Sequence, residues 1–295
     1  MARSSSEYLF QQVTIIGVGL LGGSLGLVLK EQGLAKTVVG IGRRQPNLEL
    51  AVQLGAIDRF YSEPQEAIRD SDFIVLATPV DTYVSHVQQW GQHVPSGTIV
   101  SDVGSVKGRL VFDLEAILPT TASFVGAHPI AGKEKSGVAH ATSRLFDGAR
   151  CIVTPTSRTN LEAISKVRGL WEKAGSEVLS MDPMVHDWVL GAVSHLPHIA
   201  AFSLMHALKD VQDTSSETLH LLDFSGGGLR DTTRIAASSP EMWRDICLAN
   251  RENLLKMVDQ YIGQLQAFKQ LLKNQDRAGL VKNIEQAKVL REGLT

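Results

Sequence analysis

The sequence predicts an α/β fold in which a doubly wound, mostly parallel sheet is followed by an all-helical domain. In the first half, short apolar runs without polar alternation are separated by segments with helical periodicity. Strands of that kind are buried on both faces, as in parallel sheets covered by helices. A glycine-rich turn follows the first apolar run, and no strand-like run occurs after residue 182. We therefore expect two domains, residues 1–182 and 183–295.

The apolar runs and the helical patterns of the first half alternate along the chain. Strands are expected over residues 13–16, 37–41, 72–77, 98–101, 123–126 and 151–153. Helices are expected over residues 20–32, 47–54, 82–90 and 106–118. This alternation is typical of the doubly wound architecture, in which helices cover both faces of one sheet.

The second half contains only helical patterns. Residues 185–208 are apolar with His, Ser and Gly interspersed, which predicts a helix buried on most sides. Near the C-terminus, apolar residues recur at helical spacing: Leu254, Leu255, Val258, Ile262, Leu265, Phe268, Leu271 and Leu272. This stripe fits either an intramolecular core or the seam of a homodimer, because a small helical domain has difficulty burying so much apolar surface alone.

The composition is that of an ordinary globular protein. The 295 residues include 29 Lys+Arg and 31 Asp+Glu, a formal net charge of −2, so we expect neither a nucleic-acid partner nor a membrane surface. Two distant cysteines, Cys151 and Cys247, form neither a secreted disulfide framework nor a zinc site. The N-terminal residues lack a signal-peptide pattern. These features together predict a cytoplasmic protein.

The glycine-rich turn has the spacing Gly-x-Gly-x-x-Gly between the first strand and the first helix. In that context it is the dinucleotide-binding fingerprint of the Rossmann fold. Gly17 permits the tight turn, Gly19 lets a pyrophosphate approach the backbone, and Gly22 allows close packing of the helix on the strand. The helix N-terminus offers its N–H groups to the phosphates. The expected phosphate contacts are Gly17, Gly19, Leu20, Leu21 and Gly22.

The end of the second strand suggests which nucleotide is bound. NAD sites place an acidic residue there to hold the ribose 2′-OH. This chain has no acidic residue between Glu31 and Glu49, and the strand ends in Gly42, Arg43 and Arg44. Two guanidinium groups can instead bind a 2′-phosphate, which favours NADP over NAD. Alternatively, these arginines are solvated surface charges or stack on the adenine.

Two further strands end in stretches that we expect to line the cofactor crevice, because ligands of such sheets bind at the carboxyl ends of strands. The candidates are Ala77, Thr78 and Pro79 after one strand and Asp102 and Gly104 after the next. Ordinary loop and helix-capping chemistry at Thr82 and Ser105 is the competing interpretation.

Polar residues of both halves are candidates for chemistry on a substrate. His128 ends the strand that begins at residue 123, beside the expected nicotinamide position. His195 and His198 are three residues apart, as are Asp231 and Arg234, so each pair could share a helix face. The histidine pair has no HExxH context and no nearby carboxylate cluster, so no metal is expected.

Four stretches carry a family resemblance: His-Pro-Ile-Ala-Gly-Lys-Glu at 128–134, Asp-Val-Gly-Ser-Val-Lys at 102–107, Ser-His-Leu-Pro-His at 194–198 and Arg-Asp-Thr-Thr-Arg-Ile-Ala at 230–236. With them the chain resembles the prephenate/arogenate dehydrogenase family of tyrosine biosynthesis. The resemblance implies a Rossmann domain joined to a helical dimerisation domain, and hence a homodimer. It also implies oxidative decarboxylation of prephenate to 4-hydroxyphenylpyruvate, or of arogenate to tyrosine, with hydride transfer to NAD or NADP.

The resemblance also implies roles for individual residues. His128 is the catalytic base, and Ser105 orients the substrate hydroxyl or His128 itself. An unperturbed imidazole has a pKa of about 6.5, so we expect the rate to rise with pH near neutrality. Arg234 binds a substrate carboxylate, and Asp231 holds Arg234, together with Glu134. The remaining candidates for the substrate pocket are His195, His198, Lys133 at a variable position of the motif, and Trp243, which is equally a candidate for ordinary core packing.

Two other classes fit parts of this pattern. A β-hydroxyacid dehydrogenase also joins a Rossmann domain to a helical one, but resembling enzymes use a Lys where this chain has the 194–198 stretch. A catalytically silent dinucleotide-binding module has no reason to direct His128 and Arg234 at one cofactor.

Overall fold

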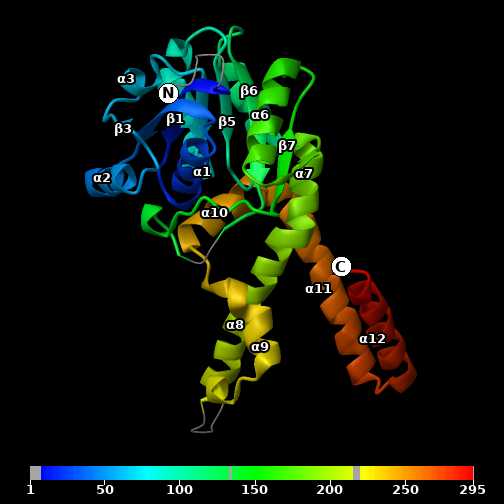
Figure 1. Ribbon diagram of the computed structural model, residues 1–295. Coiled ribbons are helices and arrows are strands. Elements are labelled where there is room, and N and C mark those ends of the chain that lie inside the picture. The colour runs from blue at the N-terminus through cyan, green and yellow to red at the C-terminus, as the bar shows by residue number, and fades with distance from the viewer. Residues whose placement is uncertain (1–7, 133–134, 215–219, 295) are drawn as a thin grey trace.

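The computed structural model describes residues 8–132, 135–214 and 220–294 (Figure 1). One sheet has the strand order β3-β2-β1-β4-β5-β6-β7-β8. The strands are β1 (Phe10–Ile16), β2 (Ala35–Ile41), β3 (Arg59–Phe60), β4 (Phe73–Leu76), β5 (Ile99–Asp102), β6 (Ser123–Pro129), β7 (Arg150–Thr154) and β8 (Glu177–Ser180). Neighbouring strands pair in parallel except β6 and β7, which are antiparallel. The expectation of a mostly parallel, doubly wound sheet is confirmed.

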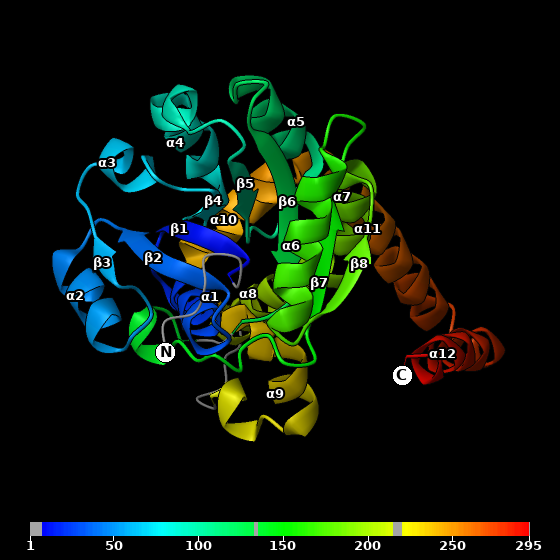
Figure 2. The ribbon, with the colours of Figure 1, turned by 45° about the horizontal axis from the view of Figure 1, so that its top comes forward.

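Helices cover both faces of this sheet (Figure 2). They are α1 (Leu20–Glu31), α2 (Gln45–Gln53), α3 (Pro64–Ile68), α4 (Tyr83–Trp90), α5 (Gly108–Ile117) and α6 (Leu161–Lys173). The core divides accordingly: one cluster joins α1, α2 and α6 to the sheet, and the other joins α3, α4 and α5 to the opposite face. Within β4, Phe73 and Val75 belong to the first cluster while Ile74 and Leu76 belong to the second, so every position of the strand is buried.

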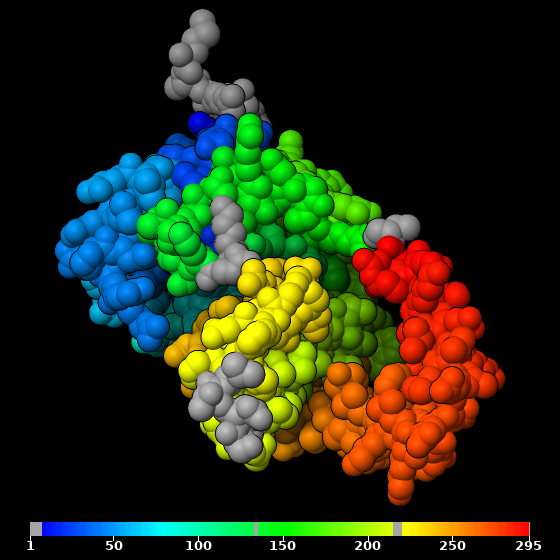
Figure 3. Space-filling view, turned by 90° about the horizontal axis from the view of Figure 1, so that it is seen from below, coloured from blue at the N-terminus to red at the C-terminus, as the bar shows by residue number. Residues whose placement is uncertain are grey.

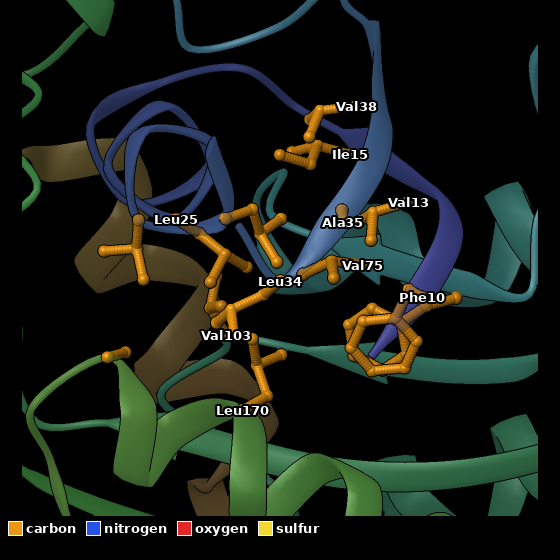
Figure 4. Packing of buried hydrophobic residues seen from close by; sticks show 14 of the residues in the cluster. Phe10, Val13, Ile15, Leu25, Leu34, Ala35, Val38, Val75, Val103 and Leu170 are labelled. Carbon is orange, nitrogen blue, oxygen red and sulfur yellow. The ribbon is translucent and has the colours of Figure 1, made fainter. Parts of the chain in front are cut away.

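The first cluster is shown in Figure 4. Val13 and Ile15 of β1, Val38 of β2 and Val75 of β4 lie close together beside α1. Phe10 stacks on Phe73 with ring centroids 4.4 Å apart, which joins the beginnings of two adjacent strands. This packing fixes β1 next to β4, and the strand order reverses between these two strands. Ligands of doubly wound sheets bind at that point of reversal.

Four elements of the first half were not expected from the sequence: β3, β8, α3 and α6. β3 has two residues and α3 five, too short for any periodicity to be visible. β8 lies at the edge of the sheet and is mostly exposed, so it lacks an apolar run. α6 is amphipathic and its start is marked by Asn160, whose side chain accepts hydrogen bonds from the N–H groups of Glu162 and Ala163.

The second half of the described chain is helical, as predicted. Its main helices are α7 (Pro183–Leu190), α8 (Leu196–Thr214), α9 (Gly227–Thr233), α10 (Pro240–Ala249), α11 (Arg251–Lys273) and α12 (Arg277–Glu292). A π-helical turn, Gly191–His195, joins α7 to α8. Asp182 caps α7 by accepting hydrogen bonds from the N–H groups of Met184 and Val185. α10 returns to the sheet and packs against the turn Val80–Thr82 that follows β4.

Two arms project away from the sheet (Figures 1 and 3). We call α8 with α9 the first arm and α11 with α12 the second arm. Because the arms diverge, the expectation that residues 185–208 are buried on most sides is wrong. In α8 only Ala201 is buried, and Trp188 and Val193 upstream of it are 60% and 69% exposed. In α11 only Leu254 and Met257 are buried.

The apolar stripe of α11 is therefore mostly not part of an intramolecular core. Leu255, Ile262, Leu265 and Leu272 are all exposed. By length and composition alone, the continuous helix Pro183–Thr214 is also apolar enough to cross a membrane, with 22% of its most apolar window buried. Exposed apolar surface of this extent marks an interaction surface.

Candidate active site

The glycine turn leaves space where a dinucleotide would bind. Gly17 has a φ of 102°, and a Cβ there would lie 2.6 Å from the carbonyl carbon of Ala77. A Cβ on Gly22 would lie 2.3 Å from the carbonyl oxygen of Gly17. A Cβ on Gly19 would meet nothing within 4 Å. Gly17 and Gly22 thus permit close packing of β1, α1 and the end of β4, whereas Gly19 borders open space.

The first turn of α1 adds hydrogen-bond donors to that space. Gly19 is the N-cap residue and provides no side-chain cap, and the turn contains no acidic residue. Leu20, Leu21 and Gly22 therefore begin a helix whose first N–H groups have no capping side chain. These N–H groups and the helix dipole suit a pyrophosphate. The residues present fit a dinucleotide.

The end of β2 carries the two arginines next to the first turn of α2. Arg43 and Arg44 are exposed. Burial lowers the pKa of His86 on α4, and the charge of Arg43 lowers it further. Arg43 is therefore within electrostatic reach of α4. A cationic side chain is thus present at the end of the second strand, where NAD enzymes place an acid.

The loop after β5 is fixed by a buried ion pair. Asp102 and Lys107 are each 1% exposed, and Lys107 Nζ lies 2.6 Å from Asp102 Oδ2. The same carboxylate accepts hydrogen bonds from the N–H groups of Gly104, at 2.8 Å, and Ala127, at 3.1 Å. Both oxygens of Asp102 are therefore engaged within the chain. Asp102 therefore fixes the conformation of this loop, and a contact of Asp102 with the cofactor remains a prediction.

His128 lies at the start of a buried hydrogen-bonded chain. Its Nδ1 is 2.9 Å from Nε2 of His186, and Nδ1 of His186 is 2.8 Å from Oδ1 of Asp187. The exposed fractions of the three residues are 7%, 0% and 5%. Oδ1 of Asp187 also accepts a hydrogen bond of 2.7 Å from the N–H group of Lys107. The Asp187 carboxylate on α7 is therefore linked to β6 through His186 and His128, and to the loop after β5 through Lys107.

This chain of bonds determines which nitrogen of His128 can accept a proton. An ionised Asp187 can only accept, so His186 carries its proton on Nδ1. The Nε2 of His186 then accepts, and His128 must carry its proton on Nδ1. The lone pair of His128 is therefore on Nε2. This atom makes no hydrogen bond to any described residue and is not among the buried unpartnered side-chain atoms, so it remains accessible.

Burial lowers the pKa of His128 well below 6.5, and the neighbouring charges of His186, Lys107 and His195 add to this effect. The expectation of a base that titrates near neutrality is therefore wrong, because a buried imidazole loses hydration that favours its charged form. His128 is neutral, and hence able to accept a proton, throughout the physiological pH range.

Ser105 is half-buried and forms no hydrogen bond with His128 in the part of the chain that the structure describes. His186 occupies the position from which His128 is oriented. For Ser105, orientation of the substrate hydroxyl is the role that remains a prediction.

His195, His198 and Trp243 form an aromatic group. His198 stacks on Trp243 at 3.7 Å between centroids, and His195 contacts the same indole edge-on at 5.8 Å. Trp243 is 6% exposed and also packs with Val106 and Ile246. Trp243 is thus both a wall beside the histidines and a core residue.

Charges link this group to the remaining site residues. The charge of His195 is one of the causes that lower the pKa of His128. For His198, burial is the main cause of the lowered pKa, and the charge of Arg234 adds to it. The Arg234 guanidinium therefore lies within electrostatic reach of His198. Asp231 is exposed, and no ion pair joins it to Arg234 among the described residues, contrary to expectation. An exposed pair of this kind gains only about 0–1 kcal/mol. Lys133 and Glu134 lie outside the described residues.

Comparison with known proteins identifies the family. The profile described as "Prephenate dehydrogenase, nucleotide-binding domain" matches residues 25–180, and "Prephenate dehydrogenase, dimerization domain" matches residues 182–286. The chain belongs to the prephenate dehydrogenase family. It is 34% identical to the prephenate dehydrogenase of Bacillus subtilis over 285 residues, which cover 96% of this chain and 76% of that enzyme.

Two solved structures of prephenate and arogenate dehydrogenases share the whole fold. Prephenate dehydrogenase of Aquifex aeolicus, in complex with hydroxyphenyl propionate and NAD+, is 38% identical with a TM-score of 0.89, covering 97% of this chain and 98% of that one. Arogenate dehydrogenase of Synechocystis is 26% identical with a TM-score of 0.83, covering 97% and 100%. Membership of the prephenate dehydrogenase family sets aside the β-hydroxyacid dehydrogenase and the silent module.

Sequence reasoning missed His186, Asp187 and Asn250 in this family member. All three are buried polar residues in the helical half. Adjacent His and Asp residues just after the start of an otherwise apolar helix were a usable signal, because buried polar groups need partners.

For this prephenate dehydrogenase family member, we predict opposite effects of alanine at two glycines of the nucleotide-binding turn. Gly19→Ala should leave the free energy of unfolding within about 0.5 kcal/mol of the wild type, yet weaken nucleotide binding, because the new methyl group enters open space. Gly17→Ala should lower the melting temperature, because it combines a positive φ with a backbone clash. Thermal unfolding and nucleotide titration measure both. Normal nucleotide affinity in Gly19→Ala would place the ligand elsewhere.

Proposed function

We propose that this chain catalyses the oxidative decarboxylation of prephenate to 4-hydroxyphenylpyruvate, with His128 Nε2 as the base. The hydrogen-bonded chain His128–His186–Asp187 is the observation that carries the proposal. It leaves one lone pair, on His128 Nε2, that no described residue engages. Arogenate is the alternative substrate, because arogenate dehydrogenase shares this fold.

The residues of the chain divide the reaction between them. A bound nicotinamide dinucleotide supplies the hydride acceptor. His128 Nε2 takes the proton of the C4 hydroxyl of prephenate while the hydride leaves C4. The bond from C1 to its carboxylate breaks, carbon dioxide departs, and the electron pair completes the aromatic ring. His186 and Asp187 stabilise the imidazolium that forms, because the carboxylate charge lies at the other end of the hydrogen-bonded chain. Arg234 holds a carboxylate of the substrate, and His195 and His198 line the ring.

Replacement of the base should affect turnover but not nucleotide binding. We predict that His128→Asn lowers kcat by about 10²–10⁴-fold, the contribution of a placed base. In the wild type, kcat/KM should stay constant through neutral pH and fall only in acid, because the ring must lose its proton to act and its pKa lies well below 6.5. Reduced-nicotinamide absorbance with prephenate, and in parallel with arogenate, measures both.

The control for this experiment is nucleotide affinity, which should be unchanged in His128→Asn. A kcat/KM profile that is half-maximal near pH 7 would contradict the buried neutral base. Wild-type turnover with arogenate and none with prephenate would move the assignment to the alternative substrate.

For the nucleotide, we propose that Arg43 and Arg44 hold the 2′-phosphate of NADP, and that the enzyme prefers NADP to NAD. The support is the exposed pair of guanidinium groups after β2 and the lack of an acid there. The Aquifex aeolicus enzyme was solved with NAD+, so the comparison leaves both nucleotides open.

Removing both guanidinium groups should separate the two nucleotides. We predict that Arg43→Ala with Arg44→Ala raises the KM for NADP by at least about tenfold, since each charge-assisted hydrogen bond contributes about 1.5–3 kcal/mol. The KM for NAD should change little. Steady-state kinetics with each nucleotide test this, and a preference for NAD that is equal in the wild type and the double variant would refute the assignment.

We further propose that the two arms join a second copy of the chain in a homodimer. The support is the match of residues 182–286 to a dimerisation domain together with the exposed apolar residues of α7, α8 and α11. An apolar hollow of about 560 Å3 on the first arm, bordered by Met205, Leu208 and Leu221, extends this surface. Both cysteines are free thiols, and we keep the cytoplasm as the expected compartment.

The dimer should dissociate when charge is placed on the second arm. We predict that the wild type sediments at twice the chain mass of 32.0 kDa and that Ile262→Glu with Leu265→Glu shifts it toward the monomer, because carboxylates resist burial. Leu161→Glu is the control, since Leu161 is 82% exposed but lies on the sheet half. Analytical ultracentrifugation decides, and an unchanged dimer in the arm variant would contradict the proposed seam.

A further inference from the structure

Asn250 connects three elements of the helical half behind the aromatic group. It lies between α10 and α11 and is 3% exposed. Its Nδ2 is 2.7 Å from the carbonyl oxygen of Asp187 and 3.1 Å from Nδ1 of His195. Its Oδ1 accepts a hydrogen bond of 2.8 Å from Nδ2 of Asn253. The amide therefore links α7, the π-helical turn and α11.

The orientation of this amide follows from its neighbours. A carbonyl oxygen only accepts, so the group 2.7 Å from the Asp187 carbonyl must be the NH2 of Asn250. The reversed amide would set two oxygens against each other at that distance. The NH2 group has a second hydrogen, and that hydrogen points to His195 Nδ1.

The orientation of the amide determines the tautomer of His195. Because Nδ1 receives a hydrogen bond, it carries no proton, and the neutral ring carries its proton on Nε2. His198 has the opposite arrangement, since its Nδ1 lies 2.9 Å from the carbonyl oxygen of Ser194 and must donate. Two histidines that contact the same indole thus differ in which nitrogen is protonated.

We propose that Asn250 is a positioning residue that fixes His195 as the Nε2–H tautomer, so that the site offers prephenate one neutral hydrogen-bond donor. The proposal rests on the proposed function for its substrate. The His195 ring is 1% exposed and its Nε2 makes no hydrogen bond to a described residue, so Nε2–H is the donor left for an oxygen atom of a bound substrate. Burial also lowers the pKa of His195 to about 4, so the ring stays neutral at working pH.

Asp187 serves both histidines through different atoms. Its carboxylate directs His186 and hence His128, while its backbone carbonyl directs Asn250 and hence His195. The proposed base, His128, and the proposed donor, His195, are therefore both oriented by hydrogen bonds that lead to Asp187.

Nitrogen NMR reads the tautomer directly and does not depend on turnover. The full-length protein is labelled with ¹⁵N at histidine, and His195→Gln assigns the His195 signals. We expect the wild type to show a protonated Nε2 and an unprotonated Nδ1 at His195, with the reverse at His198. In Asn250→Asp the carboxylate should accept a hydrogen bond from a protonated Nδ1, which would reverse the His195 pattern. In Asn250→Ala both tautomers should be populated.

Asn253→Ala is the matched control, because it removes a neighbouring amide of α11 that does not touch His195. It should leave the His195 pattern unchanged. A wild-type His195 protonated on Nδ1 would overturn the proposal. So would a wild-type pattern in folded Asn250→Asp and Asn250→Ala, with folding checked by near-ultraviolet circular dichroism.

Kinetics then separate positioning from general stability. Asn250→Asp, which reverses the tautomer and removes the donor, should raise the KM for prephenate by roughly tenfold, the loss of one hydrogen bond of about 1.4 kcal/mol, with a smaller change in kcat. Asn250→Ala, which leaves both tautomers populated, should raise this KM by only about twofold. An unchanged KM would overturn the role toward the substrate. If the wild type did not turn over prephenate, the proposed function would fail while the tautomer result would still stand.

Discussion

The carboxylate of Asp187 is the contact on which the arrangement of the site depends. One oxygen accepts hydrogen bonds from the N–H group of Lys107, in the loop after β5, and from the ring of His186 on its own helix. The sheet half and the helical half are thereby joined at a buried charged group. A Cβ at position 108 would lie 2.4 Å from the other oxygen, so glycine at that position lets α7 come this close to the loop.

The environment of this contact is polar but enclosed. Asp102 and Lys107 form a second buried pair directly beside it, and the Lys107 ammonium also donates to the carbonyl oxygens of Gly104 and Val106. Burying charges is costly unless each hydrogen-bonding group has a partner, and here the loop backbone supplies those partners. The result is a rigid loop at the carboxyl edge of the sheet. The proposed base, His128, is oriented beside this loop through His186 and Asp187, and preorganisation of this kind stabilises charge that develops during reaction.

The helical half differs in character near the sheet and away from it. Near the sheet it supplies buried polar residues, His186, Asp187, His195 and Asn250, and it packs Trp243 of α10 against Val106. Away from the sheet its two arms diverge and expose apolar side chains that a single chain cannot cover (Figure 3). The same apolar character that resembles a buried or membrane-crossing helix in the sequence fits the homodimer surface that we propose.

Features of this protein that depend on local pattern could be predicted from its sequence. Alternating apolar runs and helices gave the doubly wound sheet, the Gly-x-Gly-x-x-Gly spacing placed the nucleotide turn, and the strand ends at Arg43 and His128 identified candidate groups. The hydrogen-bond partners of those groups are known only from the folded chain. The contacts His128–His186, Lys107–Asp187 and His195–Asn250 join residues 58, 80 and 55 positions apart. Such contacts depend on how the helices dock on the sheet, and periodicity does not encode docking. For the same reason, the exposure of the arms and the lowered pKa of His128 could not be predicted from the sequence. Both depend on the surroundings of a residue and not on the residue itself.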